Sequence, residues 1–267
     1  ELLAYTAAKT GGSFDKNALK ILEKTAKVLS EGEKTMEELT ADMKYYASYR
    51  ESYDAAIGGL VGEYQEEQED GSCVQRYGLK GYFPLARGFD YSHYDDFGVS
   101  RSYGYKRQHL GHDMMGLVGT PITAVESGTV EALGWNQYGG WRIGIRSFDG
   151  RRYYYYAHLR QNYPYAEGLA EGSTVTAGDV IGYMGHTGYS TKENVNNIEV
   201  THLHWGLQLI FDESQKEGNN EIWIDVYPLT RFLAQHTQPA AKVEGTKEWK
   251  RTVRIIDPAV EEYLSEQ

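Results

Sequence analysis

The chain has a single cysteine, Cys73, among its 267 residues. A lone cysteine cannot form an internal disulfide, and it excludes a zinc cluster built from several thiolates. No run of about 20 apolar residues is present, so no transmembrane helix is expected. Lysine and arginine are outnumbered by aspartate and glutamate, 27 to 38, which gives a formal net charge of −11. A chain of this charge, with no basic stripe, is not expected to bind nucleic acid.

The first part of the chain, residues 1–70, has the periodicity of helices. Apolar residues between Leu19 and Leu29 recur at helical spacing. The segment from Thr35 to Glu38 has the pattern of a capping box, and a second apolar stripe follows it. These patterns predict a helical hairpin that packs on itself or on the next domain. The functional alternative is a surface for a protein partner.

The acidic run from Glu63 to Asp70 separates this region from the rest of the chain. It indicates a linker or the frayed end of a helix, so a domain boundary is predicted near Gly71. Beyond that point, short apolar runs alternate with glycine turns, and strands are expected at 122–125, 128–133, 141–145, 153–158, 180–184 and 203–210. Strands at hairpin spacing favour antiparallel sheets over βαβ units.

The predicted organisation is therefore a helical region at 1–70, a β-rich domain at 71–237 and a C-terminal extension at 238–267. In the extension, Asp257 and Pro258 have the pattern of a helix start, with Asp as cap and Pro in the first turn. The predicted fold class is α+β, with a mainly antiparallel β core and an N-terminal helical region.

Three short segments carry the residues of a candidate zinc site: His109-Leu-Gly-His-Asp113, Tyr156-Ala-His158-Leu159 and His202-Leu-His204. Side chains an even number of residues apart lie on one face of an extended strand, so His109 and Asp113 can share a side. The same holds for His202 and His204. Two strands crossing here would bring His109, Asp113 and His204 to one metal ion. Three protein ligands leave a fourth position open, which is typical of catalytic zinc sites.

Two further histidines are expected beside the metal rather than on it. His202 lies one pleat along the strand from His204, and His158 ends the strand that precedes it in this set. A neutral imidazole in such a place can accept a proton from water, and an imidazolium can stabilise an oxyanion or protonate a leaving amine. Both histidines are predicted to be catalytic, and which of them is the general base stays open.

In this order, the segments resemble the lysostaphin-type (LytM-like) zinc endopeptidases, which cut bacterial cell-wall peptides. That family carries His-x-Gly-x-Asp, then a Tyr-Ala-His-Leu type segment, then His-Leu-His, and all three appear in this chain. The resemblance covers residues 97–210 and includes turns marked by glycine. It implies a compact antiparallel β core with a substrate groove.

The resemblance also implies a function: a zinc-dependent endopeptidase that hydrolyses peptide bonds of peptidoglycan, in the stem or the cross-bridge. The alternative is a catalytically silent or autoinhibited LytM-like scaffold or regulator of cell-wall remodelling. Because wall peptides lie outside the cytoplasm, an extracellular or bacterial cell-envelope location is expected, with the export signal or anchor absent from this chain. Carried over by position, the Zn²⁺ ligands are His109, Asp113 and His204, and the catalytic histidines are His158 and His202.

The chain departs from the family pattern in one segment. Residues 192–201 separate Ser190-Thr191 from the last motif, and this insertion is expected to form a loop at the groove wall. Tyr103, in an aromatic run before the first motif, is assigned by the resemblance to substrate binding; the alternative is a plain core or wall residue.

The remaining histidines are given no role at the metal. His112 lies inside the first motif, but its parity places it opposite the two predicted ligands there, so it is not expected to bind metal. His186 is either a groove contact or a plain turn residue. His93 and His236 are expected at the surface.

Overall fold

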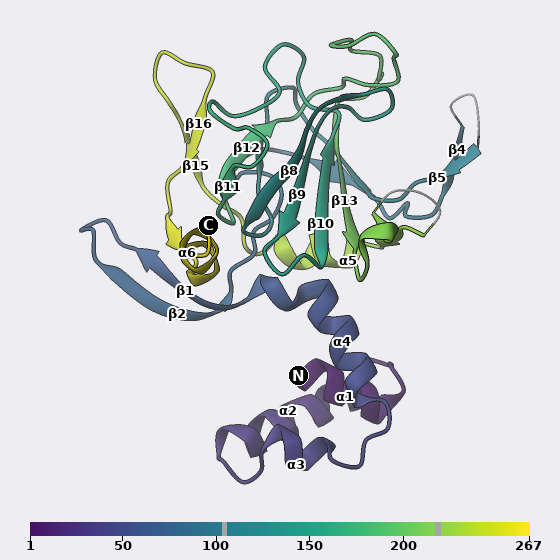
Figure 1. The fold of residues 1–267 in the computed structure, drawn as a ribbon, viewed down its shortest axis with the longest axis vertical. Helices are drawn as coiled ribbons and strands as arrows, with labels where there is room; N and C mark the ends of the chain where they lie inside the picture. Colours follow the sequence, from purple (N-terminus) through teal and green to yellow (C-terminus); the bar gives the residue numbers. More distant parts are fainter. Residues whose placement is uncertain (103–105, 217–219) are drawn as a thin grey trace. The chain divides into compact units, whose positions relative to one another are not determined.

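The computed structural model describes residues 1–102, 106–216 and 220–267. The chain divides into two compact units, residues 1–58 and residues 59–267, and each is described by itself. Among the described residues, no helix combines the length and the apolar character needed to cross a membrane. The mainly antiparallel β fold with an N-terminal helical region, expected from the sequence, is confirmed (Figure 1).

The helical unit contains α1 (Leu2–Thr10), α2 (Lys16–Ser30), α3 (Met36–Thr40) and α4 (Tyr46–Ile57). Helix α2 begins where the carboxylate of Asp15 accepts hydrogen bonds from the next exposed backbone N–H groups. The predicted capping box at Thr35 and Glu38 is present and starts α3. The second apolar stripe forms two helices rather than one, because the chain turns between α3 and α4.

The predicted boundary near Gly71 is wrong, because the acidic run is a strand. After the short 3-10 helix η1 (Gly58–Leu60), β1 (Val61–Glu67) pairs along its whole length with β2 (Cys73–Leu79). The acidic side chains stand on an exposed ribbon, where Glu66 meets Arg76 across the strands at 3.2 Å. Backbone pairing therefore orders a segment whose composition alone indicated a linker.

The main antiparallel sheet carries the interior of the larger unit. Its strands, in spatial order, are β11 (Thr174–Val175), β8 (Gly128–Asn136), β9 (Gly140–Ser147), β10 (Arg152–Ala157), β13 (His202–Leu209), β6 (His112–Met115) and β3 (Ser92–His93). Strand β14 (Ile222–Ile224) also pairs with β13. Side chains from β9, β10 and β13, including Ile143, Tyr154 and Trp205, are fully buried. Each predicted strand in this region is present, with small shifts at its ends.

Smaller elements surround this sheet. Strand β7 (Pro121–Thr123) pairs with β12 (Val180–Tyr183), and β4 (Ser100–Ser102) pairs with β5 (Lys106–Gln108) just before the first motif. Helix α5 (Tyr227–Leu233) follows β14. In Figure 1 the β4–β5 hairpin projects from the edge of the unit that also carries β13.

The last residues belong to the larger unit rather than forming a separate extension. They contain β15 (Ala240–Lys242), β16 (Trp249–Arg251), β17 (Ile255–Ile256) and α6 (Pro258–Ser265). Strand β17 pairs with β1, and Asp257 caps α6 as predicted. The buried carboxylate of Asp257 also accepts hydrogen bonds from Lys80 at 2.7 Å and from Ser127 at 2.6 Å. The predicted division at residue 237 therefore cuts through connected structure.

Candidate metal centre

Three candidate ligand atoms, two from the first motif and one from the third, meet in one place. Nε2 of His109 lies 3.0 Å from Oδ1 of Asp113 and 3.0 Å from Nδ1 of His204. The third side of this triangle, from Nδ1 of His204 to Oδ1 of Asp113, measures 2.9 Å. These are the residues that the sequence predicted as metal ligands, and the structure brings all three together.

The sheet explains how Asp113 and His204 come together. Strands β6 and β13 are antiparallel neighbours, and Asp113 lies directly opposite His204 in their register. The side chains of opposite residues in such a pair point to the same face. His109 precedes β6 in a loop that follows β5, so it reaches the carboxylate from a bend and not along one strand.

Gly111, in the middle of the first motif, leaves space for the ring of His204. A Cβ atom at this position would lie 2.5 Å from Cε1 of His204 and 2.9 Å from the carbonyl oxygen of Trp205. Both distances are shorter than real Cβ contacts. The motif therefore needs glycine here because the loop carrying one ligand packs directly on another ligand.

The donor set and its spacing fit a divalent metal ion. Nδ1 of His109 faces the carbonyl oxygen of Asp96 at 3.3 Å, so this nitrogen carries the proton and Nε2 presents a lone pair. That lone pair points at a carboxylate oxygen that also lacks a proton, an arrangement that a cation between them stabilises. Ligand atoms held about 2.0–2.1 Å from a tetrahedral zinc lie about 3.3 Å apart, close to the spacing observed.

The electrostatic surroundings keep Asp113 ionised. Burial opposes its ionisation, but the close approach of the His109 and His204 rings outweighs it and holds the pKa of this carboxyl well below its usual range. Burial lowers the pKa of His204 and so favours the neutral imidazole that binds metals. An ionised Asp113 carboxylate beside a neutral His204 imidazole is thus the stable state of this pair.

The two predicted catalytic histidines lie beside this group. The ring centroids of His158 and His202 are 4.7 Å apart, and His158 is 6.0 Å from His204. Nδ1 of His158 donates to the carbonyl oxygen of Thr187 at 3.0 Å, and Nδ1 of His202 donates to that of Val200 at 2.8 Å. Because carbonyl oxygens only accept, each ring carries its proton on Nδ1 and keeps Nε2 as an acceptor.

His158 is held in a constrained position. It follows the end of β10 with φ of 64°, a left-handed conformation that is uncommon outside glycine. The carbonyl oxygen of Thr187 accepts the hydrogen bond from His158. Thr187 is itself buried, and its hydroxyl donates a hydrogen bond to the carbonyl oxygen of Leu159 at 2.6 Å. Burial lowers the pKa of His158 well below its usual range, and the nearby imidazoles of His202 and His204 lower it further. This imidazole is therefore neutral at neutral pH.

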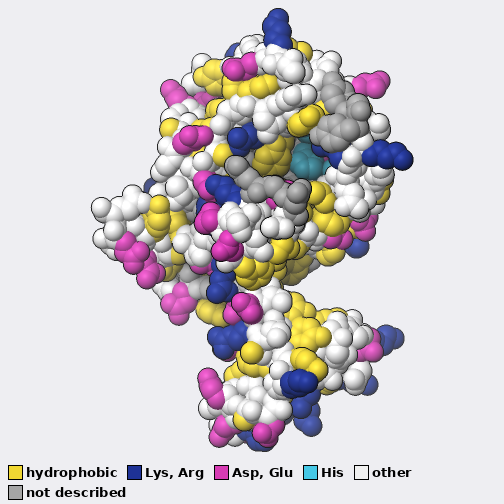
Figure 2. Space-filling view, turned by 45° about the vertical axis from the view of Figure 1, so that its right-hand side comes forward, with side chains coloured by type: hydrophobic (Ala, Val, Ile, Leu, Met, Phe, Trp, Pro, Cys, Tyr) yellow, Lys and Arg dark blue, Asp and Glu magenta, His cyan; other side chains and the backbone are white. Residues whose placement is uncertain are grey.

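The group opens onto a cleft of about 700 Å³ whose lining includes Arg101, Asp113, Met115 and His202. In the space-filling view a histidine side chain is visible within a hollow bordered by apolar side chains (Figure 2). Tyr103, predicted to bind substrate, lies outside the described residues.

The insertion between the second and third motifs is a loop, as predicted, and it is anchored to the core. The side-chain oxygen of Asn194 accepts a hydrogen bond from Trp141 at 2.9 Å, and its backbone carbonyl accepts one from Gln161 at 2.7 Å. Before the insertion, the ring of Tyr189 lies 5.8 Å from that of His158. Near the end of the insertion, Val200 lines the cleft, so this segment contributes to the cleft wall.

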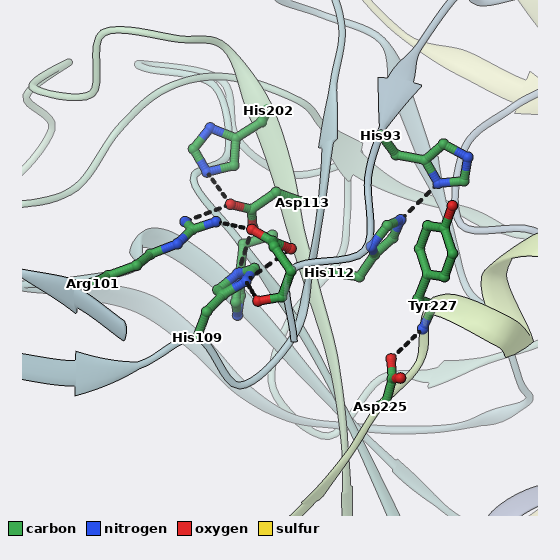
Figure 3. A network of polar contacts seen from close by, with 10 residues as sticks. His93, Arg101, His109, His112, Asp113, His202, Asp225 and Tyr227 are labelled. Carbon is green, nitrogen blue, oxygen red and sulfur yellow. Dashed lines mark hydrogen bonds and ion pairs between the residues drawn. The ribbon is translucent and has the colours of Figure 1, made fainter. Parts of the chain in front are cut away.

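The other histidines take different positions. His112 is directed away from the metal-binding group, as its parity predicted, and its Nε2 meets Nδ1 of His93 at 2.8 Å (Figure 3). The expectation that His93 and His236 are surface residues is wrong, because both are half-buried and His236 stacks on Tyr82. His186 donates to the carbonyl oxygen of Ile198 and so fixes the loop.

Two residues of the site were not found from the sequence. Arg101 donates to Oδ2 of Asp113 at 2.7 Å and to the carboxylate of Asp96 (Figure 3). Asp96 also places its Oδ1 3.1 Å from Nδ1 of His109. Neither residue belongs to a motif. Arg101 lies in β4, which pairs with β5, and no periodicity in the sequence predicted these short strands.

Comparisons with known proteins identify relatives of this chain. The model of Peptidase family M23 matches residues 107–217. L-Ala–D-Glu endopeptidase of Bacillus subtilis (strain 168) is 34% identical over 198 residues, which cover 70% of this chain and 57% of that protein. Lysostaphin of Staphylococcus simulans is 37% identical over 89 residues, which cover 33% of this chain and 17% of that protein.

A solved structure extends the similarity beyond the family domain. The crystal structure of lytM from Ruminococcus gnavus ATCC 29149, a protein for which glycyl-glycine endopeptidase activity is proposed, has a TM-score of 0.56 and 29% identity. It covers 85% of this chain, which in turn covers 75% of it. By contrast, this chain spans just over half the length of the Bacillus relative and less than a fifth of lysostaphin.

Proposed function

Because this chain belongs to peptidase family M23, with the family domain at residues 107–217, we propose that it is a zinc-dependent endopeptidase of bacterial cell-wall peptidoglycan. The observation that carries the proposal is the triangle of His109, Asp113 and His204, whose ligand atoms lie 2.9–3.0 Å apart. The rings of His158 and His202 lie beside this triangle, and Asp113 lines a cleft.

In this proposal His109 binds zinc through Nε2, His204 through Nδ1 and Asp113 through Oδ1. When bound, Zn²⁺ supplies Lewis acidity that polarises a peptide carbonyl and acidifies water. The protein contributes a carboxylate with a strongly lowered pKa and, in His204, an imidazole that burial keeps neutral, so both groups are ready for metal at neutral pH.

His158 and His202 are proposed to handle the proton transfers. Each ring is tied to a backbone carbonyl through Nδ1, so each presents Nε2 as a base of fixed orientation. After accepting a proton at Nε2, an imidazolium can donate it to a leaving amine or stabilise negative charge on the carbonyl oxygen. Nε2 of His202 lies 3.7 Å from Oδ2 of Asp113, and that carboxylate would stabilise the protonated ring.

The substrate class rests on the relatives. The Bacillus protein is named for the bond between L-Ala and D-Glu, and we propose peptidoglycan peptides as substrates of this chain, with the bond to be determined. The site of action would then be outside the cytoplasm or in the cell envelope. A protein partner for helices α1–α4 remains a separate proposal.

The alternative of a catalytically silent scaffold is not favoured. A silent relative would be expected to lack one of the ligands, whereas all three ligand positions and both flanking histidines are filled here.

The proposed activity can be tested on defined muropeptides. The zinc-loaded full chain is expected to release fragments whose masses, measured by mass spectrometry, identify the bond. A chelator should stop the release and added Zn²⁺ should restore it, while His204→Ala should remain inactive with excess zinc. A folded, zinc-loaded protein that releases nothing from stem or bridge peptides would contradict the proposal.

A further inference from the structure

The two carboxylate oxygens of Asp113 have different neighbours. Oδ1 faces the ring nitrogens of His109 and His204 at 3.0 and 2.9 Å. Oδ2 accepts a hydrogen bond from the guanidinium of Arg101 at 2.7 Å. One oxygen is thus directed at the metal-binding group, and the other is held by a charged donor.

The same guanidinium reaches the other side of the group. Its second nitrogen donates to Oδ2 of Asp96, and Asp96 meets Nδ1 of His109 with both its carboxylate and its backbone carbonyl. Arg101, Asp96, His109 and Asp113 therefore form a closed ring of polar contacts. Because the ring includes two of the proposed ligands, moving Arg101 would change the orientation of both.

Burial makes this contact strong and Arg101 hard to replace. The side chains of Asp96 and Asp113 are 7% and 6% exposed, and the guanidinium lies between them. Ion pairs of this kind are charge-assisted, and the planar guanidinium can serve two carboxylates at once, which an ammonium group cannot do in the same geometry. Without Arg101, two buried carboxylates would repel each other.

The hairpin that carries Arg101 supports a specific role for this residue. Arg101 and Arg107 are directly opposite each other in β4 and β5, a pairing of like charges that is unfavourable in itself. The two side chains make different contacts: Arg101 binds the carboxylates, and Arg107 lies over the ring of Tyr189, 5.1 Å from its centroid. The carboxylates therefore help to hold Arg101 in place.

We infer that Arg101 is a positioning residue that reserves Oδ2 of Asp113, so that this ligand offers the metal one oxygen only. A carboxylate free to bind through both oxygens would add a fifth ligand and crowd the position that a catalytic site keeps open. The inference rests on the proposed metal site, and it adds a residue that no motif contains.

Substitution of Co²⁺ for Zn²⁺ tests this inference without measuring activity. Tetrahedral Co²⁺ absorbs visible light more strongly than five-coordinate Co²⁺, so the spectrum reports how many ligands bind. Arg101→Gln should weaken the visible bands at full metal occupancy, because Oδ2 becomes free to bind. Arg107→Gln removes the same charge from the same hairpin and should keep the spectrum of the unmodified protein.

The kcat and KM of the Arg101 variants provide a second test of the inference. With zinc restored, Arg101→Gln should lower kcat by about 10- to 100-fold, as loss of a partner of a metal ligand typically does, with little change in KM. Arg101→Lys keeps the charge but can hold only one carboxylate, and it serves if Arg101→Gln does not fold. It too should weaken the Co²⁺ bands.

The outcomes separate the inference from the proposed function. An unmodified chain that binds neither Co²⁺ nor Zn²⁺ would refute the metal site itself. If the unmodified chain binds Co²⁺ and the Arg101 variants give the same spectrum and the same kcat, the metal site stands and the inference is wrong.

Discussion

The two faces of strand β6 carry histidine clusters that look alike and behave differently. On one face Asp113 meets His109 and His204, and on the other His112 meets His93 beneath the ring of Tyr227 (Figure 3). His112 and Asp113 are neighbours in the sequence, and strand geometry alone sends them to opposite sides.

The presence of a carboxylate explains the difference. Nδ1 of His93 and Nε2 of His112 lie 2.8 Å apart, and one can donate to the other, so two neutral rings satisfy each other without a cation. Burial and the neighbouring His93 lower the pKa of His112 to about 4, which keeps the pair neutral. On the Asp113 face, two imidazoles converge on an ionised carboxylate, and a cation between them would stabilise the group. The number of histidines in a cluster therefore does not indicate whether the cluster can bind a metal ion.

The strongest test of this comparison substitutes the two adjacent residues, Asp113 and His112, in separate variants. Asp113→Ala should abolish stable zinc binding and lower hydrolysis of wall peptides by more than about 10⁴-fold, because it removes both a ligand and the only anion among the three. His112→Leu, in the next position of the strand, should retain one zinc per chain. Metal content after gel filtration distinguishes them, and zinc loss in both variants would invalidate the contrast between the faces.

The second test separates metal binding from proton transfer. His158→Ala and His202→Ala should each lower kcat by about 10²- to 10⁴-fold, the range for loss of a general acid or base, while zinc content stays near that of the unmodified protein. Activity measured at matched metal occupancy gives the result. Full activity in both variants would leave proton transfer to other groups.

The third test concerns the space that the Asp113 face requires. Gly111→Ala should lower kcat/KM by about 10²-fold, because the added methyl displaces the ring of His204 and small misplacements in a site have large effects. Gly62→Ala in β1 is a control, since a Cβ there meets only the side chain of Lys80, at 3.6 Å. Equal activity of the two variants would show that the loop yields to the methyl group.

The smallest effect is expected on the face of β6 that carries His112, and it is an effect on stability. His112→Leu should reduce the free energy of unfolding of the metal-free protein by no more than about 1 kcal/mol, because one hydrogen bond is lost and half-buried His93 can turn to water. Thermal unfolding of the unmodified and variant chains measures this. A much larger loss would mean that the His93–His112 pair is a structural centre of the unit.

The sequence predicted the parts of the site that depend on local spacing. His202 and His204 share a strand face because β13 is regular, and His112 is excluded by the same parity. The convergence of His109 and Asp113 was predicted for a partly wrong reason, because His109 lies in a bend and not on the strand. The family motif and strand parity both predicted that His109 and Asp113 share a site, but only the motif does so for a reason that the structure supports.

Contacts between distant segments could not be predicted from the sequence. Arg101 lies in β4, Asp96 lies in the segment before it, and single residues of this kind have no periodicity to detect. The strand β1 was missed because its acidic side chains resemble those of a linker, although Asp70-Gly71 is a common hairpin turn. In both cases the deciding contacts are made across the sheet and not along the chain.

The carboxylate of Asp257 joins the chain's last segment to residues more than 100 positions earlier, through Lys80 and Ser127. A chain that stopped at residue 237 would leave the half-buried ammonium of Lys80 and the buried hydroxyl of Ser127 without their carboxylate partner, and β1 would lose its partner β17. To express the larger unit without the helical unit at residues 1–58, the chain should therefore begin near Gly59 and continue through α6.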